Sequence, residues 1–313
     1  MAKKKSAGEF VDPKVDIAFK KIFGDEKKTH ILISFLNAVM KKDIIKVTVL
    51  NPYQVPKLKE LKYTILDIKA EDSKGDEYII EMQANPYVWF DKRALDYLSR
   101  AYVNQLDLGD DYSLHKPVYF IGVLDFNYFN SKKYLTKHFI VNLETSEQEI
   151  KDFEFYFIEL KKFKKQLSEL KNVLDKWIFF LKELHEMNAL PRELSEIPEI
   201  SEAAETAKQS LWTKEEMEVY YKIRREEARE INLIQELKKA KNQLEENEKQ
   251  LEKNEKQLEE NEKQLEEKDE ILRTQENDLK KAIQALQKSG STLETIAQIL
   301  NKEVAEISRL LEA

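Results

Sequence analysis

The sequence predicts an α/β fold in which a central mixed sheet is flanked by helices, followed by a long coiled-coil helix and a small C-terminal helical hairpin. Three observations lead to this prediction. Segments with apolar residues at helical spacing alternate with strand-like runs up to about residue 190. The run VYFIGVLDF at 118–126 is almost wholly apolar, which is typical of a strand covered on both faces. Beyond residue 200 the chain becomes strongly charged, and leucine recurs every seven residues.

The first part of the chain contains the elements of the predicted sheet and its helices. Apolar residues at helical spacing around 15–23 and 32–39, separated by a Gly-Asp pair, predict two short helices. Two strand-like runs flank a polar turn in TILDIKAEDSKGDEYIIEMQ, residues 64–83. The other elements expected before residue 200 are a helix over 89–108, strands over 138–144 and 153–160, and an amphipathic helix over 164–187.

The long helix is predicted from the heptad repeat and is expected to start near Thr213. The recurring leucines are Leu244, Leu251, Leu258, Leu265, Leu272, Leu279 and Leu286. The second core position falls on Asn247, Asn254 and Asn261 in one register and on glutamates in the other, and asparagine is the better tolerated residue. We therefore expect a homodimer through the 213–287 helix. A solvated single helix, supported by Glu-Lys pairs four residues apart, is the alternative.

The divisions of the chain follow its proline and charge patterns, because no proline occurs after Pro198. We predict a first domain over 1–200, the long helix over 213–287 and a helical hairpin over 288–313. Ser291 and Glu294 are spaced as a capping box at the start of that hairpin. A helix-turn-helix is compatible with its spacing, but only Lys302 and Arg309 are basic there, which favours a hairpin used for packing.

Composition narrows the classes of function. Residues 1–200 hold 32 basic and 32 acidic side chains, so the whole net charge of -7 comes from the rest of the chain, and no overall basic footprint indicates nucleic-acid binding. The absence of cysteine excludes disulfides, thiolate metal sites and cysteine nucleophiles. MAKKKSAGEF is not followed by an apolar run, and no stretch approaches 18 apolar residues. A soluble cytoplasmic protein with no membrane span is expected.

The turn in residues 64–83 brings two acids together. If the hairpin turns about Lys74, with Gly75 as a permissive backbone, residues whose numbers sum to 148 lie opposite each other, which pairs Asp67 with Glu81. Gln83 shares the face of Glu81. Two carboxylates so close repel each other, and a hard divalent cation such as Mg²⁺ relieves that repulsion. A lysine, a protonated acid, a different register or a plain solvated face are the alternatives.

The order of several motifs resembles a known family. These motifs are DPKVDIAFKKIFGDEKKTHILISFLNAVM, LDIKAEDSKGDEYIIEMQ, RALDYLSRAYVNQL and GDDYSLHKPVYFIGVLDF. Together they are similar to the Rpn recombination-promoting nucleases and transposase-like proteins of the PD-(D/E)xK nuclease superfamily. The resemblance covers roughly residues 10–200 and implies a restriction-endonuclease-like core.

The resemblance also implies roles for individual residues of a Mg²⁺-dependent DNA endonuclease, with Mn²⁺ or Ca²⁺ as alternative ions. Asp67 matches the metal-binding aspartate and Glu81 the second ligand. Gln83 stands where the superfamily signature has lysine, and an amide cannot shuttle a proton. Asp16, at the start of the first helix, matches an acid that completes the site.

Two more residues are candidates for contact with phosphate. Arg93 and Tyr97 lie four apart on one helical face, although a surface arginine and a packed tyrosine would show the same spacing. The predicted function is a metal-dependent DNA endonuclease associated with recombination or mobile elements. The alternatives are a catalytically inactive DNA-binding or coiled-coil assembly protein that retains the fold, and a chain whose long helix is a spacer or a partner-binding rod.

Overall fold

The computed structural model of the chain describes residues 8–51, 53–54 and 64–312. The chain divides into two compact units, Met1–Leu233 and Ile234–Ala313. The expectation drawn from the first ten residues rests mainly on residues 1–7, which lie outside the described residues.

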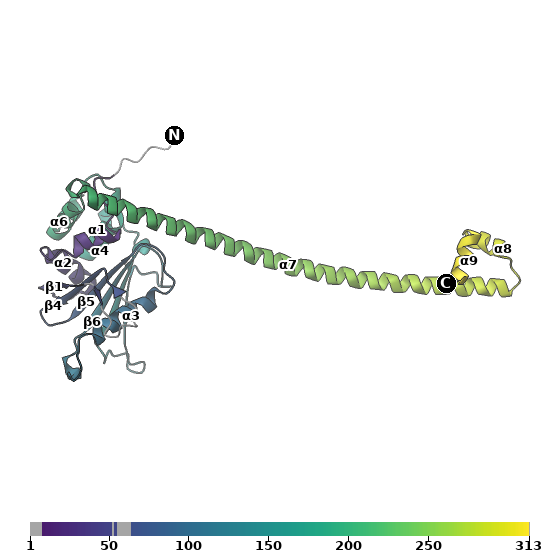
Figure 1. Cartoon of the computed structure of the whole chain (residues 1–313), viewed down its shortest axis with the longest axis horizontal. Helices are drawn as coiled ribbons and strands as arrows, with labels where there is room; N and C mark the ends of the chain where they lie inside the picture. Colours follow the sequence, from purple (N-terminus) through teal and green to yellow (C-terminus); the bar gives the residue numbers. More distant parts are fainter. Residues whose placement is uncertain (1–7, 52, 55–63, 313) are drawn as a thin grey trace. The chain divides into compact units, whose positions relative to one another are not determined.

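The first unit contains a sheet and the helices that cover it (Figure 1). Its strands are β1 (Val47–Leu50), β2 (Tyr53–Gln54), β3 (Thr64–Ile65), β4 (Ile68–Asp72), β5 (Glu77–Gln83), β6 (Val118–Leu124), β7 (Leu135–Phe139) and β8 (Phe153–Glu159). Its α-helices are α1 (Asp16–Phe23), α2 (Thr29–Met40), α3 (Phe90–Val103), α4 (Val173–Glu183), α5 (Arg192–Ser195), α6 (Pro198–Thr206) and the start of α7 (Lys214–Lys288). Short 3₁₀ turns lie at Tyr112–Leu114, Leu160–Lys162, Leu167–Glu169, Leu184–Glu186 and Gln209–Leu211.

Six strands form one mixed sheet in the order β1-β4-β5-β6-β8-β7, and β2 pairs separately with β3. The β4–β5 hairpin is antiparallel, whereas β5, β6 and β8 run parallel to one another. Parallel neighbours need a crossover connection, and α3 supplies the one between β5 and β6. The predicted sheet flanked by helices is therefore confirmed.

Each face of the sheet has its own hydrophobic core. Tyr78 and Ile80 of β5 pack into the core with α1, α2, α4 and α6, whereas Ile79 packs into the core with α3. Every residue of β6 is buried, as predicted for a strand covered on both faces. A side chain at Gly122 of β6 would come within 3.0 Å of the Phe90 ring, so this glycine lets α3 approach the sheet closely.

Three predicted elements have different bounds in the structure. The helix expected over 89–108 is α3, which ends at Val103. The strand expected over 138–144 is β7, which ends at Phe139 because Asn142 starts a turn: its side chain accepts the Glu144 N–H, and its backbone N–H bonds to the Glu147 carbonyl. The helix expected over 164–187 is α4, which begins only after Asn172. That side chain accepts the Asp175 N–H at 2.8 Å and caps the helix.

Helix α7 starts where the sequence predicts. The Thr213 hydroxyl accepts the Glu216 N–H, and the Glu216 carboxylate accepts the Thr213 N–H, which together form a capping box. Residues 214–233, which we call the α7 root, belong to the first unit. The side chains of Met217, Tyr220 and Ile223 pack against its larger core.

The second unit holds the rest of α7 together with α8 (Leu293–Leu300) and α9 (Val304–Glu312). Ile283 of α7 packs with Ile296 and Ile307, which confirms the predicted helical pair. The predicted cap is displaced by one residue: Thr292, not Ser291, has the extended backbone of a cap, and its hydroxyl accepts the Thr295 N–H.

Candidate active site

The predicted pair of acids lies at the open end of the β4–β5 hairpin. Asp67 is in a bend directly before β4, and Glu81 is in the second half of β5. The observed pairing of Ile68 with Ile80 places Asp67 opposite Glu81, so the predicted register is confirmed. Gly75 has a φ of +85° in the turn, a conformation that a residue with a Cβ rarely adopts.

Reciprocal hydrogen bonds fix the two carboxylates against the backbone. The Asp67 N–H donates to Glu81 Oε1 at 2.9 Å, and the Met82 N–H donates to Asp67 Oδ2 at 2.8 Å. Each carboxylate therefore uses one oxygen to hold the other residue's strand in place. The second oxygen of each acid lies outside this reciprocal pair of bonds.

Burial disfavours the ionised form of both acids when no cation is bound. Glu81 is only 4% exposed, and burial, reinforced by the negative charge of Asp67, raises the pKa of Glu81 to about 8. Burial also raises the pKa of Asp67, against the opposing effects of the Met82 N–H and the Lys20 ammonium. The pair thus carries an electrostatic penalty that a bound cation would remove.

Lys20 of α1 is a site residue that sequence reasoning missed. Its Nζ lies 2.7 Å from Asp16 Oδ1 and 3.4 Å from Asp67 Oδ1. Burial alone would lower the pKa of Lys20, but the contacts with Asp16 and Asp67 outweigh that effect and raise it. The sequence signal that could have identified Lys20 is its spacing from Asp16, four residues away on the same helix. Asp16, predicted from the family resemblance, shares this lysine with Asp67, and its carboxyl group also interacts directly with the Asp67 carboxyl.

Replacing Lys20 with Met is expected to raise the pKa of the Asp67 carboxyl by about one unit, because a nearby cation is removed from a partly buried acid. The measurement is an NMR titration of the aspartate carboxyl carbons in metal-free protein. The matched control is Lys21→Met, because Lys21 forms an ion pair with Glu216 instead. An Asp67 pKa unchanged by Lys20→Met would contradict the assignment of Lys20 to this site.

Gln83 is held by both ends of its amide. Arg93 Nη2 donates to Gln83 Oε1, and Gln83 Nε2 donates to the backbone oxygen of Asn85 at 3.1 Å. The amide orientation is set by these two partners, because a flipped amide would place its NH₂ group against the arginine donors. Gln83 is thus a fixed, neutral group on the strand that carries Glu81.

Arg93 and Tyr97 of α3 both lie beside the predicted pair of acids. The Arg93 guanidinium lies over the rings of Tyr87 and Phe90, with its central carbon 5.1 Å and 4.8 Å from their centroids. Burial, followed by the charge of Glu81, raises the pKa of Tyr97 to about 12. The structure brings both residues to the site, while their contact with phosphate stays a prediction.

The donor set suits a hard cation that keeps much of its water. Within the described ranges, no cluster of three or more His, Cys, Asp or Glu side chains is arranged to hold a metal. Mg²⁺ commonly binds proteins through one or two carboxylates and retains several waters. Asp67 and Glu81, each with one oxygen outside their reciprocal bonds, fit that requirement.

The α7 root forms part of the surroundings of the site, a second feature that sequence reasoning missed. Asn85, two residues beyond Gln83, donates from Nδ2 to the Glu227 carbonyl at 3.3 Å and to Glu230 Oε2 at 2.5 Å. Burial, followed by the charge of Asp12, raises the pKa of Glu227 to about 7. No sequence pattern distinguishes these glutamates from the others on the helix.

A comparison with protein families shows which family this chain belongs to. A sequence model described as PD-(D/E)XK nuclease family transposase matches residues 13–236. The chain belongs to this family. No curated protein and no solved structure matches the chain.

Membership of the PD-(D/E)XK nuclease family confirms the resemblance and indicates a nuclease function connected with mobile elements, with DNA as the implied substrate. The matched range contains every predicted site residue and also the α7 root. The mixed six-stranded sheet with flanking helices fits the same family. Of the helices in the described part of the chain, none combines the length and apolar character needed to cross a bilayer.

Proposed function

We propose that the chain is a metal-dependent DNA endonuclease that hydrolyses phosphodiester bonds and acts in recombination or in mobile elements. The observation that carries the proposal is the pair formed by Asp67 and Glu81. A buried glutamate and a partly buried aspartate are held together by backbone hydrogen bonds, and each keeps one oxygen outside those bonds. Placing two acids this close together lowers the stability of the folded protein unless a cation is bound. In a nuclease family, this loss of stability is a reason to assign a metal site to the pair.

Asp67 and Glu81 would hold the ion, for which Mg²⁺ is the first candidate and Mn²⁺ or Ca²⁺ the alternatives. A bound divalent ion would lower the pKa of a coordinated water and neutralise charge on the phosphate. Asp16 would complete the site from α1, because its carboxylate lies 2.7 Å from Lys20 and interacts directly with Asp67.

The remaining residues of the site have separate roles in this proposal. Lys20 balances the charge of Asp67 and orients that carboxylate. Gln83 supplies hydrogen bonds from a fixed amide and does not accept a proton, because an amide is not a base near neutral pH. Arg93 and Tyr97 would contact phosphate oxygens beside the pair of acids.

The test of the proposal is cleavage of supercoiled plasmid DNA by the purified full chain with Mg²⁺, with Mn²⁺ and with a chelator. We expect nicking that depends on the ion and stops when the chelator is added. Cleavage that persists in the chelator would contradict the metal dependence. DNA binding without cleavage under any ion would favour the alternative of an inactive DNA-binding protein, for which Gln83 in place of a lysine is the motivating observation.

The exposed leucines of α7 support a second part of the proposal, a homodimer through this helix. Leu244, Leu251, Leu258, Leu265 and Leu272 are each more than half exposed, although they repeat at the heptad spacing. In the Leu/Asn register they alternate with Asn247, Asn254 and Asn261, which form the other half of the seam. A second copy of the chain would cover this stripe.

Replacing Leu251 and Leu258 with Gln together is expected to convert the dimer to a monomer, because two apolar core positions of an already weak seam are lost. Light scattering coupled to size exclusion measures the mass. Glu252→Gln with Glu259→Gln is the matched control, since it introduces the same amides one position away from the seam. A mass that is the same for all three proteins would contradict dimerisation through this stripe.

A further inference from the structure

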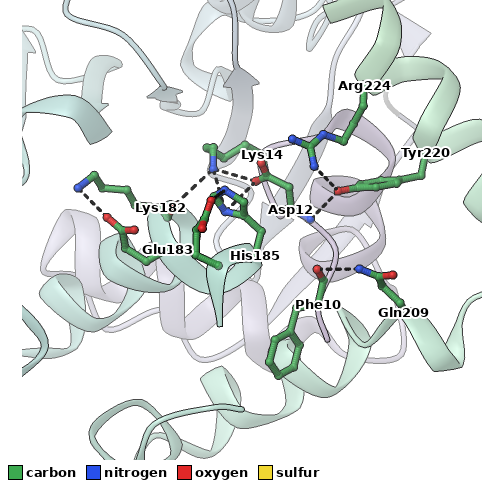
Figure 2. A network of polar contacts seen from close by, with 10 residues as sticks. Phe10, Asp12, Lys14, Lys182, Glu183, His185, Gln209, Tyr220 and Arg224 are labelled. Atoms are coloured by element: carbon green, nitrogen blue, oxygen red, sulfur yellow. Dashed lines mark hydrogen bonds and ion pairs between the residues drawn. The ribbon is translucent and has the colours of Figure 1, made fainter. Parts of the chain in front are cut away.

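The α7 root presents polar side chains to the part of the chain that carries the site. At its first contact, the Asp12 N–H donates to the Tyr220 hydroxyl at 2.8 Å, and Arg224 Nη1 donates to the same oxygen at 3.4 Å (Figure 2). Asp12 is buried and forms an ion pair with Lys14. Asp12 and Lys14 lie just before α1, the helix that carries Asp16 and Lys20.

At its second contact, the α7 root reaches the end of β5 through Asn85. This side chain is 3% exposed, and its amide bonds to the Glu227 carbonyl and to the Glu230 carboxylate. Its Oδ1 is buried without a hydrogen-bond partner among the described residues. Because a buried amide with an unsatisfied oxygen costs free energy, packing alone does not account for an asparagine here.

The second contact completes a continuous hydrogen-bonded chain through the site. It runs from Arg93 to the Gln83 amide, from Gln83 to the Asn85 carbonyl, and from the Asn85 side chain to Glu230. We propose that Asn85 and Glu230 are positioning residues that hold the Gln83 amide in its working orientation, so that the α7 root is part of the catalytic unit. This inference rests on the proposed nuclease function.

The physical reason lies in the freedom of a glutamine side chain. The terminal torsion of glutamine is broad, so its amide keeps one orientation only when both of its ends have partners. The acceptor for Gln83 Nε2 is the backbone oxygen of Asn85, which lies two residues beyond the end of β5. The side chain of the same residue, Asn85, is anchored on α7, which fixes that oxygen in place.

A double-mutant cycle separates positioning through Gln83 from a general structural role. The four full-length proteins are the wild type, Asn85→Ala, Gln83→Ala and the double variant, compared by single-turnover cleavage of plasmid DNA with Mg²⁺. We expect Asn85→Ala to lower the cleavage rate about tenfold, the equivalent of one lost hydrogen bond, with the DNA concentration at half-maximal rate unchanged. In the Gln83→Ala background the same change is expected to have almost no further effect.

Three further variants control for loss of folding. Glu230 is exposed, so Glu230→Ala leaves folding intact and is expected to lower the rate in the same direction as Asn85→Ala, whereas Glu226→Ala on the same helix is expected to leave it unchanged. Asn172→Ala removes the cap of α4 and is expected to lower the melting temperature without changing the cleavage rate.

The possible results separate this inference from the proposed function. Full activity of Asn85→Ala and Glu230→Ala would overturn the inference and leave the nuclease assignment intact. Losses that multiply independently in the double variant would also overturn it, because Asn85 would then not act through Gln83. A wild-type chain that does not cleave DNA with metal would overturn both.

Discussion

Replacing Asp67 with Asn, or Glu81 with Gln, is expected to reduce metal-dependent DNA cleavage by about 10²–10³-fold. Each substitution preserves the size of the side chain but removes one of the two charges that would hold the ion. The reciprocal bonds in which Asp67 Oδ2 and Glu81 Oε1 accept backbone N–H groups can be kept by the amide oxygens, so the hairpin is expected to stay folded. The loss of cleavage would therefore measure the contribution of the carboxylate charge to catalysis.

The matched control for this prediction is Glu77→Gln. Glu77 is also a buried glutamate of β5 on the same face as Glu81, but it pairs with Lys69 at 2.9 Å, at the other end of the strand. Its replacement is expected to leave cleavage within about twofold of the wild type, because it lies outside the site. Cleavage by Glu81→Gln at the wild-type rate, with intact metal dependence, would remove Glu81 from the proposed ligands.

The second large effect is on stability: Glu81→Gln is expected to stabilise the metal-free protein at pH 8. The pKa of Glu81 is raised from its ordinary value to about 8, so the folded state favours the protonated acid. Its contribution to the free energy of unfolding is complete below pH 4 and is lost as the pH rises towards 8. A neutral amide does not suffer this loss, and each kcal/mol recovered raises the melting temperature by about 2–4 °C.

Melting curves of the wild type and Glu81→Gln between pH 5 and 8, in the presence of a chelator, measure this effect. The variant should melt at a higher temperature at pH 8, and the difference should shrink as the pH falls. Addition of Mg²⁺ should stabilise the wild type and not the variant, because only the wild type keeps both charges. A wild type that melts above Glu81→Gln at pH 8 without metal would contradict the proposed cost of burying this pair.

The hairpin that carries the site could be predicted because residues close together in the sequence determine its turn and its register. Gly75 permits the turn, and alternation along both strands determines which side chains share a face, so the register that pairs Asp67 with Glu81 follows from adjacent residues. The buried strand β6 and the start of α7 at its capping box were predictable for the same reason. The ends of β7 and α4 were not, because Asn142 and Asn172 redirect the backbone through their own side chains.

The rest of the candidate site depends on contacts between residues far apart in the sequence. Lys20 meets Asp67 only after α1 packs beside the sheet, and the pairing of Asp16 with Lys20 looks like any helix-surface ion pair. Asn85 meets Glu230 across 145 residues, on a helix whose glutamates repeat in large numbers. The heptad and charge patterns of α7 predict one long helix over 213–287, and only the fold distinguishes its root from the remainder.

The location of a bound metal ion tests the central claim most directly. Crystals of the full chain soaked with Mn²⁺ would show the ion through its anomalous scattering. The proposed function predicts a peak between Asp67 and Glu81, with ligand distances of about 2.0–2.3 Å to one oxygen of each acid and water at the remaining positions. A well-occupied ion elsewhere in the first unit, with both acids keeping their metal-free hydrogen bonds, would contradict it.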